Sequence, residues 1–211
     1  MRASVHAVYL RALLFFLTVL TAAVRGDGSA LDALKLIPRD AAKRLARIEA
    51  REGSPAPERW YLLVHEPTER RGLREFVVAD GKLVTSRTLS QFADSLNPAD
   101  VIGAETVKVD SAQIAKLAAA FADANGTKAG LLNYELARDA VSGVVTWKVT
   151  VLDAAGDQLG ILAVSATKGT VLGADGFEKL PAGIVIAPPA PPVTAQQPAG
   201  KNPKPTPKRK R

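Results

Sequence analysis

Residues 144–175 read VVTWKVTVLDAAGDQLGILAVSATKGTVLGAD, and they decide the expected fold. Apolar and polar side chains alternate along 144–152, with Val145, Trp147, Val149 and Val151 on one side and Thr146, Lys148 and Thr150 on the other. This period of two is typical of a strand with one buried and one wetter face. Apolar runs at 158–166 and 170–172 follow, separated by turn residues at 153–157 and 167–169. The stretch predicts antiparallel strands, with Trp147 as a core anchor.

A helix and another strand are expected just upstream. Residues 111–124, SAQIAKLAAAFADA, place Ile114 and Phe121 on one apolar face. Ser111 is a suitable N-cap, and Asn125-Gly126 is a suitable end. The run LLNYELA at 131–137 predicts the strand that follows this helix.

The earlier part of the chain predicts a similar order. Residues 38–52, PRDAAKRLARIEARE, favour a helix with Leu45 and Ile48 on its apolar side. The run WYLLVH at 60–65 predicts a strand. Residues 73–87 predict a hairpin that turns at Asp80-Gly81. A helical segment at 89–98, LSQFADSLNP, is expected to link the two parts.

The predicted fold class is α+β, with helices packed on an antiparallel sheet. Two halves, 32–98 and 99–178, repeat the order of a helix followed by strands, and ADGKLV at 79–84 matches TKGTVL at 167–172. Leu45 and Leu117 correspond when the expected helices are aligned. Either the halves are tandem duplicates, or they share an order that many such units have. One helix cannot cover both faces of its sheet, so one face is left for solvent, the other half or a partner.

The segment TWKVTVLDAAGDQLGILAVSATKGTVL resembles the second half of a PepSY domain, with its tryptophan-bearing strand and its small glycine hairpin at 167–171. The doubled arrangement is similar to the fold of the beta-lactamase inhibitor protein family, in which two helix-plus-sheet units form a concave gripping face. The resemblance covers roughly residues 38–177. It implies a non-enzymatic envelope module that restrains proteases or binds other proteins, and it supplies no catalytic residues.

The first 26 residues predict an export signal. Residues 1–11 hold two arginines and no acid, and residues 12–24, ALLFFLTVLTAAV, are uncharged and apolar. A membrane span needs about 20 apolar residues, so this run fits the hydrophobic region of a signal peptide better. The alternative is an uncleaved anchor through residues 12–24. Both predict a periplasmic or extracellular location.

The positive charge of the chain is concentrated at its ends. The net charge is +7, yet residues 26–178 hold 18 basic and 21 acidic residues. Nucleic-acid-binding domains carry basic charge on the folded surface, so this class of partner is disfavoured. Residues 179–211, rich in proline and alanine, predict a disordered tail. Its basic residues are expected to bind anionic lipid or wall polymer: Lys201, Lys204, Lys208, Arg209, Lys210 and Arg211.

The sequence offers little for catalysis. Cysteine is absent, which excludes disulfides, thiolate metal sites and cysteine nucleophiles. His65 is the one histidine outside the signal, and the acid pairs Glu66–Glu69 and Asp153–Asp157 lie where turns place acids. We therefore predict no catalytic residue, no metal and no cofactor.

Three functions are compared. The first is a binding or inhibitory module that uses an exposed sheet face, with the candidate contacts Tyr61, His65, Thr146, Lys148 and Thr150. The second is an envelope-tethering protein that acts through its tail. The third is a hydrolase of unrecognised type. The first is favoured.

Overall fold

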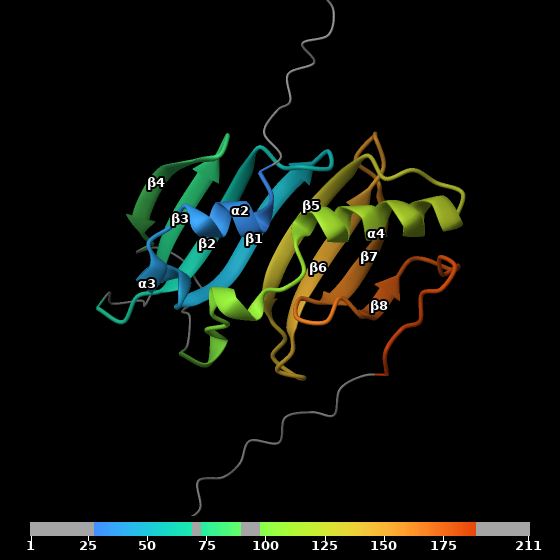
Figure 1. Ribbon diagram of the computed structural model, residues 1–211. Helices are drawn as coiled ribbons and strands as arrows, with labels where there is room; N and C mark the ends of the chain where they lie inside the picture. The colour runs from blue at the N-terminus through green and yellow to red at the C-terminus, as the bar shows by residue number, and fades with distance from the viewer. Residues whose placement is uncertain (1–27, 69–72, 90–97, 189–211) are drawn as a thin grey trace, which may run out of the picture.

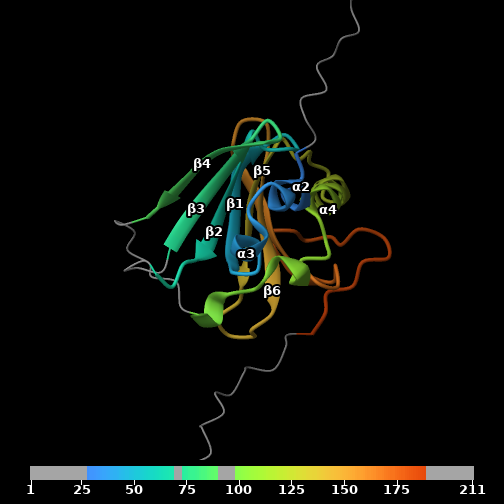
Figure 2. The same ribbon diagram turned by 60° about the vertical axis from the view of Figure 1, so that its left-hand side comes forward.

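A computed structural model of the chain describes residues 28–68, 73–89 and 98–188. Its framework is one eight-stranded sheet in the order β4-β3-β2-β1-β5-β6-β7-β8, and every neighbouring pair is antiparallel. The helices lie on one side of this sheet (Figures 1 and 2). The expected antiparallel sheet with packed helices is confirmed.

The strands account for most of the regular structure. They are β1 (Leu45–Gly53), β2 (Arg59–His65), β3 (Leu73–Ala79), β4 (Lys82–Thr88), β5 (Leu131–Arg138), β6 (Val145–Leu152), β7 (Gln158–Ser165) and β8 (Val171–Asp175). The helices are α2 (Ala30–Lys35), α3 (Arg39–Ala42) and α4 (Ser111–Ala124), with short 3-10 turns η2 (Pro98–Asp100) and η3 (Ala104–Thr106).

The alternation along 144–152 is confirmed. Four side chains of β6, Val145, Trp147, Val149 and Val151, are buried in the main core, whereas Lys148 is exposed. Trp147 is fully buried, and its indole Nε1 donates to the carbonyl oxygen of Val109 at 2.9 Å. This bond joins the middle of the sheet to the residue just before the N-terminus of α4.

Helix α4 forms where the sequence predicted it, but its N-cap is Asp110 and not Ser111. The Asp110 carboxylate accepts from the Ser111 backbone, and the Gln113 side chain accepts from the Asp110 N–H at 3.0 Å. An Asp with Gln three positions later forms such a reciprocal cap. The Ser111 hydroxyl instead accepts from the Ala30 N–H at 3.0 Å, which ties α4 to α2.

The predicted helix over 38–52 is wrong beyond its first turn. Helix α3 ends at Ala42, and residues 45–53 form β1, the strand between β2 and β5. Residues such as Ala, Arg, Glu and Leu favour helices in isolation. Here Ile48 and Ala50 gain more by burial, with Leu62 and Leu136 opposite Ile48 on the two neighbouring strands. The alignment of Leu45 with Leu117 as helical partners is wrong for the same reason.

The hairpin of β3 and β4 is confirmed, with its turn at Asp80-Gly81. Both turn residues have positive φ, 49° at Asp80 and 67° at Gly81. A two-residue hairpin turn of this kind favours Asp or Asn followed by Gly, because few other residues adopt that backbone without strain. All seven residues of β4 are exposed, and the main strand contacts of α2 and α3 are with β2, two strands further into the sheet.

Part of the segment 179–188, which the sequence assigned to the tail, contacts the folded body near β8, and Ile184 packs on the main core. Ile186 bridges Val171 of β8, and the Ala187 N–H donates to the Val171 carbonyl at 2.8 Å. The Asn125 side chain holds the backbone of Glu178 and Lys179. The predicted signal, most of the predicted linking helix and residues 189–211 lie outside the described residues. Among the described helices, none has the length and apolar character to cross a membrane.

Candidate docking surface on the open sheet face

The two faces of the sheet differ in what covers them. One, the helix face, packs on α2 and α4 and contains the main core, including Trp60, Phe121 and Trp147. We call the opposite side the open face. One register row crosses all eight strands on it, from β4 to β8: Thr85, Val77, Tyr61, Glu49, Glu135, Lys148, Ala163 and Gly173.

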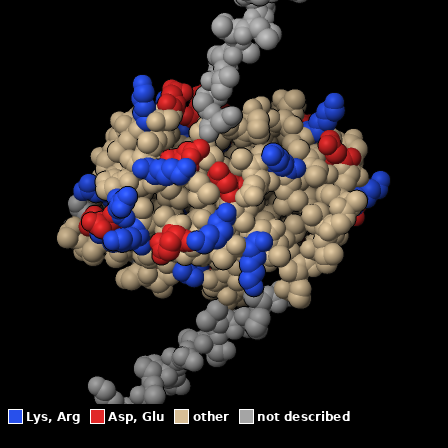
Figure 3. Space-filling view, viewed as in Figure 1, with Lys and Arg blue, Asp and Glu red and all other residues tan. Residues whose placement is uncertain are grey.

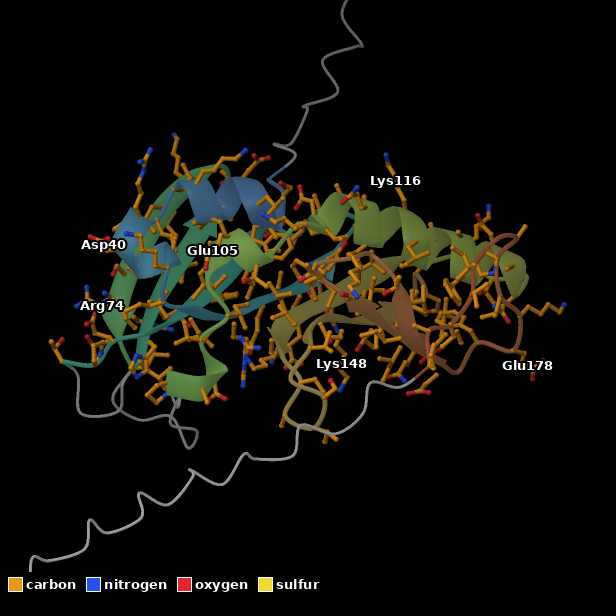
Figure 4. All side chains as sticks on the ribbon, turned by 60° about the horizontal axis from the view of Figure 1, so that its bottom comes forward. Asp40, Arg74, Glu105, Lys116, Lys148 and Glu178 are labelled. Atoms are coloured by element: carbon orange, nitrogen blue, oxygen red, sulfur yellow. The ribbon has the colours of Figure 1, made fainter. Side chains whose placement is uncertain are left out.

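Four of the five predicted contact residues occupy the middle of this face. Thr146, Lys148 and Thr150 follow one another along β6, and Tyr61 lies in the same row as Lys148, three strands away. Three strand spacings are about 14 Å. Lys148 and the helix-face residue Lys116 project from opposite sides of the molecule (Figure 4).

His65 is on the same face but does not join the other four. It ends β2 opposite Leu73, two rows from Tyr61. The His65 N–H donates to the Arg44 carbonyl at 2.9 Å, and the His65 carbonyl accepts from Arg44 Nε at 2.9 Å. Its ring makes no hydrogen bond in the described part of the chain. His65 therefore belongs to the far end of the sheet.

A hollow of 380 Å³ lies on the β5–β8 part of the open face. Glu135, Thr146, Lys148, Ile161 and Asp175 are among its lining residues, and they come from four adjacent strands. The floor therefore combines apolar side chains with charges of both signs. Such a mixed, concave surface can make both apolar and polar contacts with a ligand.

The charges around this hollow are largely unpaired. Glu135 lies directly opposite Lys148, but neither takes part in an ion pair within the described residues. The Arg138 guanidinium donates to two carbonyl oxygens, those of Gly143 at 2.8 Å and Val101 at 2.9 Å. Charged groups without internal partners remain available to an incoming ligand.

One carboxylate at the rim is held in its charged form. Asp139 accepts hydrogen bonds from the Ser142 hydroxyl and backbone N–H, both at 2.7 Å, and from the Val141 N–H at 3.2 Å. The hydrogen bond from the Ser142 side chain is the main reason that the pKa of Asp139 is lowered. The turn between β5 and β6 thus presents a fixed negative charge.

The β1–β4 part of the open face is more closed. Leu63, Leu73 and Leu89 form a second buried cluster there, apart from the main core. The Glu75 side chain is only 8% exposed and accepts from Arg87 Nε at 2.7 Å. Strand β4 is exposed throughout, so the closed part of the open face is that of β2 and β3, and strand alternation did not predict this difference.

Sequence reasoning also missed a groove on the helix face. A cavity of 540 Å³ lies between α2 and α4, and Pro55, Ala115, Ala119 and Tyr134 are part of its mostly apolar lining. The Tyr134 hydroxyl donates to the Pro55 carbonyl at 2.7 Å, and burial raises the pKa of this phenol. A pattern of small residues on α4 was the only available signal. Basic and acidic side chains are interspersed on the view of this face (Figure 3).

No group of three or more metal-ligating side chains occurs within residues 28–68, 73–89 and 98–188. The predicted polyanion-binding residues of the tail lie outside those ranges, so tethering through the tail stays a prediction. Comparisons with protein families, with curated proteins and with solved structures found no match to the chain.

Proposed function

We propose that this protein is a non-enzymatic, exported binding or inhibitory module that holds a protein or peptide partner on the open face. The part of the face that binds is the hollow of β5–β8, with Thr146, Lys148 and Thr150 as its central strand. Export is proposed from the apolar run at 12–24 and its basic flank.

The observation that carries this proposal is the 380 Å³ hollow on a sheet face that no described helix covers. The other face already has its apolar side chains packed beneath α2 and α4. On β6, Trp147 is buried in the core whereas Lys148 is exposed and forms no ion pair among the described residues, so the Lys148 side of the strand is available for a partner. Interfaces of this kind use a few central residues for most of their affinity.

We also propose that the two halves are related by duplication, as in the tandem arrangement described above. The strand order supports this, because β1 to β4 and β5 to β8 each run outward from the centre in chain order. The first half differs in having short helices in place of one long helix, since α2 and α3 together replace the counterpart of α4. A PepSY-like ancestry remains part of the same proposal.

The test is capture of partners from an envelope extract by the immobilised protein. The double variant Lys148→Glu with Thr146→Arg reverses charge and adds bulk at the hollow. The matched control, Lys116→Glu with Ala112→Arg, makes the same kind of change on exposed positions of α4. We expect the first variant to lose the captured partner and the control to keep it, with equal thermal stability for both.

Retention of every partner by the open-face variant would show that binding occurs elsewhere. Loss of the partner by both variants would also contradict the proposal, because the loss would then follow from the changed charge of the protein and not from the position of the substitutions.

A further inference from the structure

The charged hollow lies close to the point where the described chain ends. The last residues before Pro188 are fastened to β8 by the Ala187–Val171 hydrogen bond of 2.8 Å. The same strand supplies Gly173 and Asp175 to the lining of the hollow. The four residue-to-residue steps of strand from Val171 to Asp175 span about 13 Å. The chain beyond Pro188 therefore starts within a short reach of the hollow.

The length of that chain matches the distance it would have to cover. Twelve residues, 189–200, separate Pro188 from Lys201, the first residue of the basic cluster. A flexible segment of this length has an r.m.s. end-to-end distance of about 19 Å, and proline makes it longer. A tether that matches its span gives an effective concentration of about 1 mM at the site.

The charges are complementary. The tail carries six basic residues and no acid between residues 201 and 211. Three carboxylates line the hollow, those of Glu135, Asp139 and Asp175, and none of them forms an ion pair in the described chain. Lys148 and Arg138 also line the hollow, and the hydrogen bonds of Arg138 to two backbone carbonyls leave its charge in place, so the lining has a net charge of −1 against the +6 of residues 201–211.

We propose that residues 201–211 of the same chain dock reversibly on the β5–β8 hollow and compete with the partner for the open face. This inference rests on the proposed function for its regulatory meaning, but the docking itself requires no partner. A tail that occupies the hollow half of the time lowers the apparent affinity for a partner about twofold. A polyanion that binds residues 201–211 would draw them away from the hollow and leave the open face accessible to a partner.

The docking is tested on the full-length protein without any partner. The chain has no cysteine, so Thr206→Cys provides a unique attachment point for a spin label without removing a charge. We expect paramagnetic broadening of the backbone amides of Ala163, Gly173 and Asp175 at low salt. The broadening should disappear near 1 M salt, where the Debye length is about 3 Å.

Two variants assign the effect to the hollow. Glu135→Lys with Asp175→Lys should abolish the broadening, and the milder pair Glu135→Gln with Asp175→Asn should reduce it if the first pair disturbs folding. Glu58→Lys with Asp123→Lys makes the same charge change at exposed positions outside the hollow and should leave the broadening intact.

Broadening that is absent at low salt, or that persists unchanged in the Glu135→Lys with Asp175→Lys variant, overturns the inference. Equal broadening between a labelled copy and a separate isotope-enriched copy overturns it too, because the contact would then be intermolecular. None of these results depends on whether a partner binds the face. If the spin-label experiment shows docking but the capture experiment finds no partner on the open face, the proposed function is wrong and the docking of the tail is still supported.

Discussion

Glu49 on β1 and Glu135 on β5 lie directly opposite each other across the centre of the sheet, on the open face. Arg47 pairs with Glu49 at 3.2 Å, but Glu135 has no ion-pair partner among the described residues. Like charges opposite each other in a sheet are destabilising. Glu135 therefore has a like charge opposite it on β1 and the opposite charge of Lys148 opposite it on β6.

Replacing Glu135 should change the stability of the protein only slightly. We expect Glu135→Gln to alter the free energy of unfolding by less than about 0.5 kcal/mol, because relief of the repulsion from Glu49 offsets the lost attraction to Lys148 on the other side. Urea unfolding measures the change, with Glu58→Gln at an exposed loop position as the control. A loss of more than about 1 kcal/mol on Glu135→Gln would mean that Glu135 supports the sheet.

Trp147 should be among the side chains whose removal lowers the free energy of unfolding most. Its ring is fully buried, and its Nε1 bond to Val109 links β6 to the start of α4. Trp147→Ala is expected to cost about 3–5 kcal/mol in the free energy of unfolding. Trp147→Phe keeps most of the packing but loses the hydrogen bond, so it should cost less. Chemical denaturation of the two variants gives both values, and a cost below 1 kcal/mol for alanine would contradict the assigned core role.

Gly160 should not tolerate a side chain. A Cβ at this position would lie 2.5 Å from the ring of Phe177 and 2.7 Å from the carbonyl oxygen of Asp175. Phe177 in turn packs on Phe121 of α4, with ring centroids 5.4 Å apart. Gly160→Ala is therefore expected to destabilise the protein by about 1–3 kcal/mol through overpacking. Thermal unfolding measures this, and unchanged stability would show that Phe177 is free to move aside.

The Asp139 turn should show a defined pH dependence. Hydrogen bonds from Ser142 lower the pKa of this carboxyl in the folded state, so its contribution to stability is complete above the unfolded pKa and is lost as pH falls through the folded pKa. Asp139 is exposed, so Asp139→Asn should cost only about 0.5 kcal/mol at neutral pH. The difference between wild type and variant should shrink as the pH falls through the folded pKa, which lies below the usual value for Asp. A difference that grows on acidification would have the wrong sign.

The strands and the helix of the second half could be predicted from the sequence, because the local preferences of the residues agree with the way they pack in the fold. Strict alternation around Trp147 and the glycine after Asn125 favour the elements that form, although the N-cap of α4 is Asp110 and not the predicted Ser111. Strand β1 could not be predicted from the sequence, because its residues favour a helix. Ile48 and Ala50 are buried on one side only through their pairing with the neighbouring strands. Local propensity is weak against such burial.

The candidate site was predicted only in part. Alternation placed Thr146, Lys148 and Thr150 on the exposed side of β6, and the structure puts them there. It gave no information on the position of His65 at the far end of β2, or on Glu135 and Asp175, which come from other strands. Which residues line the same hollow depends on the order of the strands in the sheet, and the alternation within one strand does not predict that order.

The most direct test of the docking surface places a photo-reactive residue at position 148 on β6 or at position 116 on α4, both exposed, in otherwise unchanged protein. After irradiation in an envelope extract, we predict a covalent product with one defined partner from position 148 and none of that product from position 116. Cross-linking of the same partner from position 116 alone would place recognition on the helix face and contradict the account.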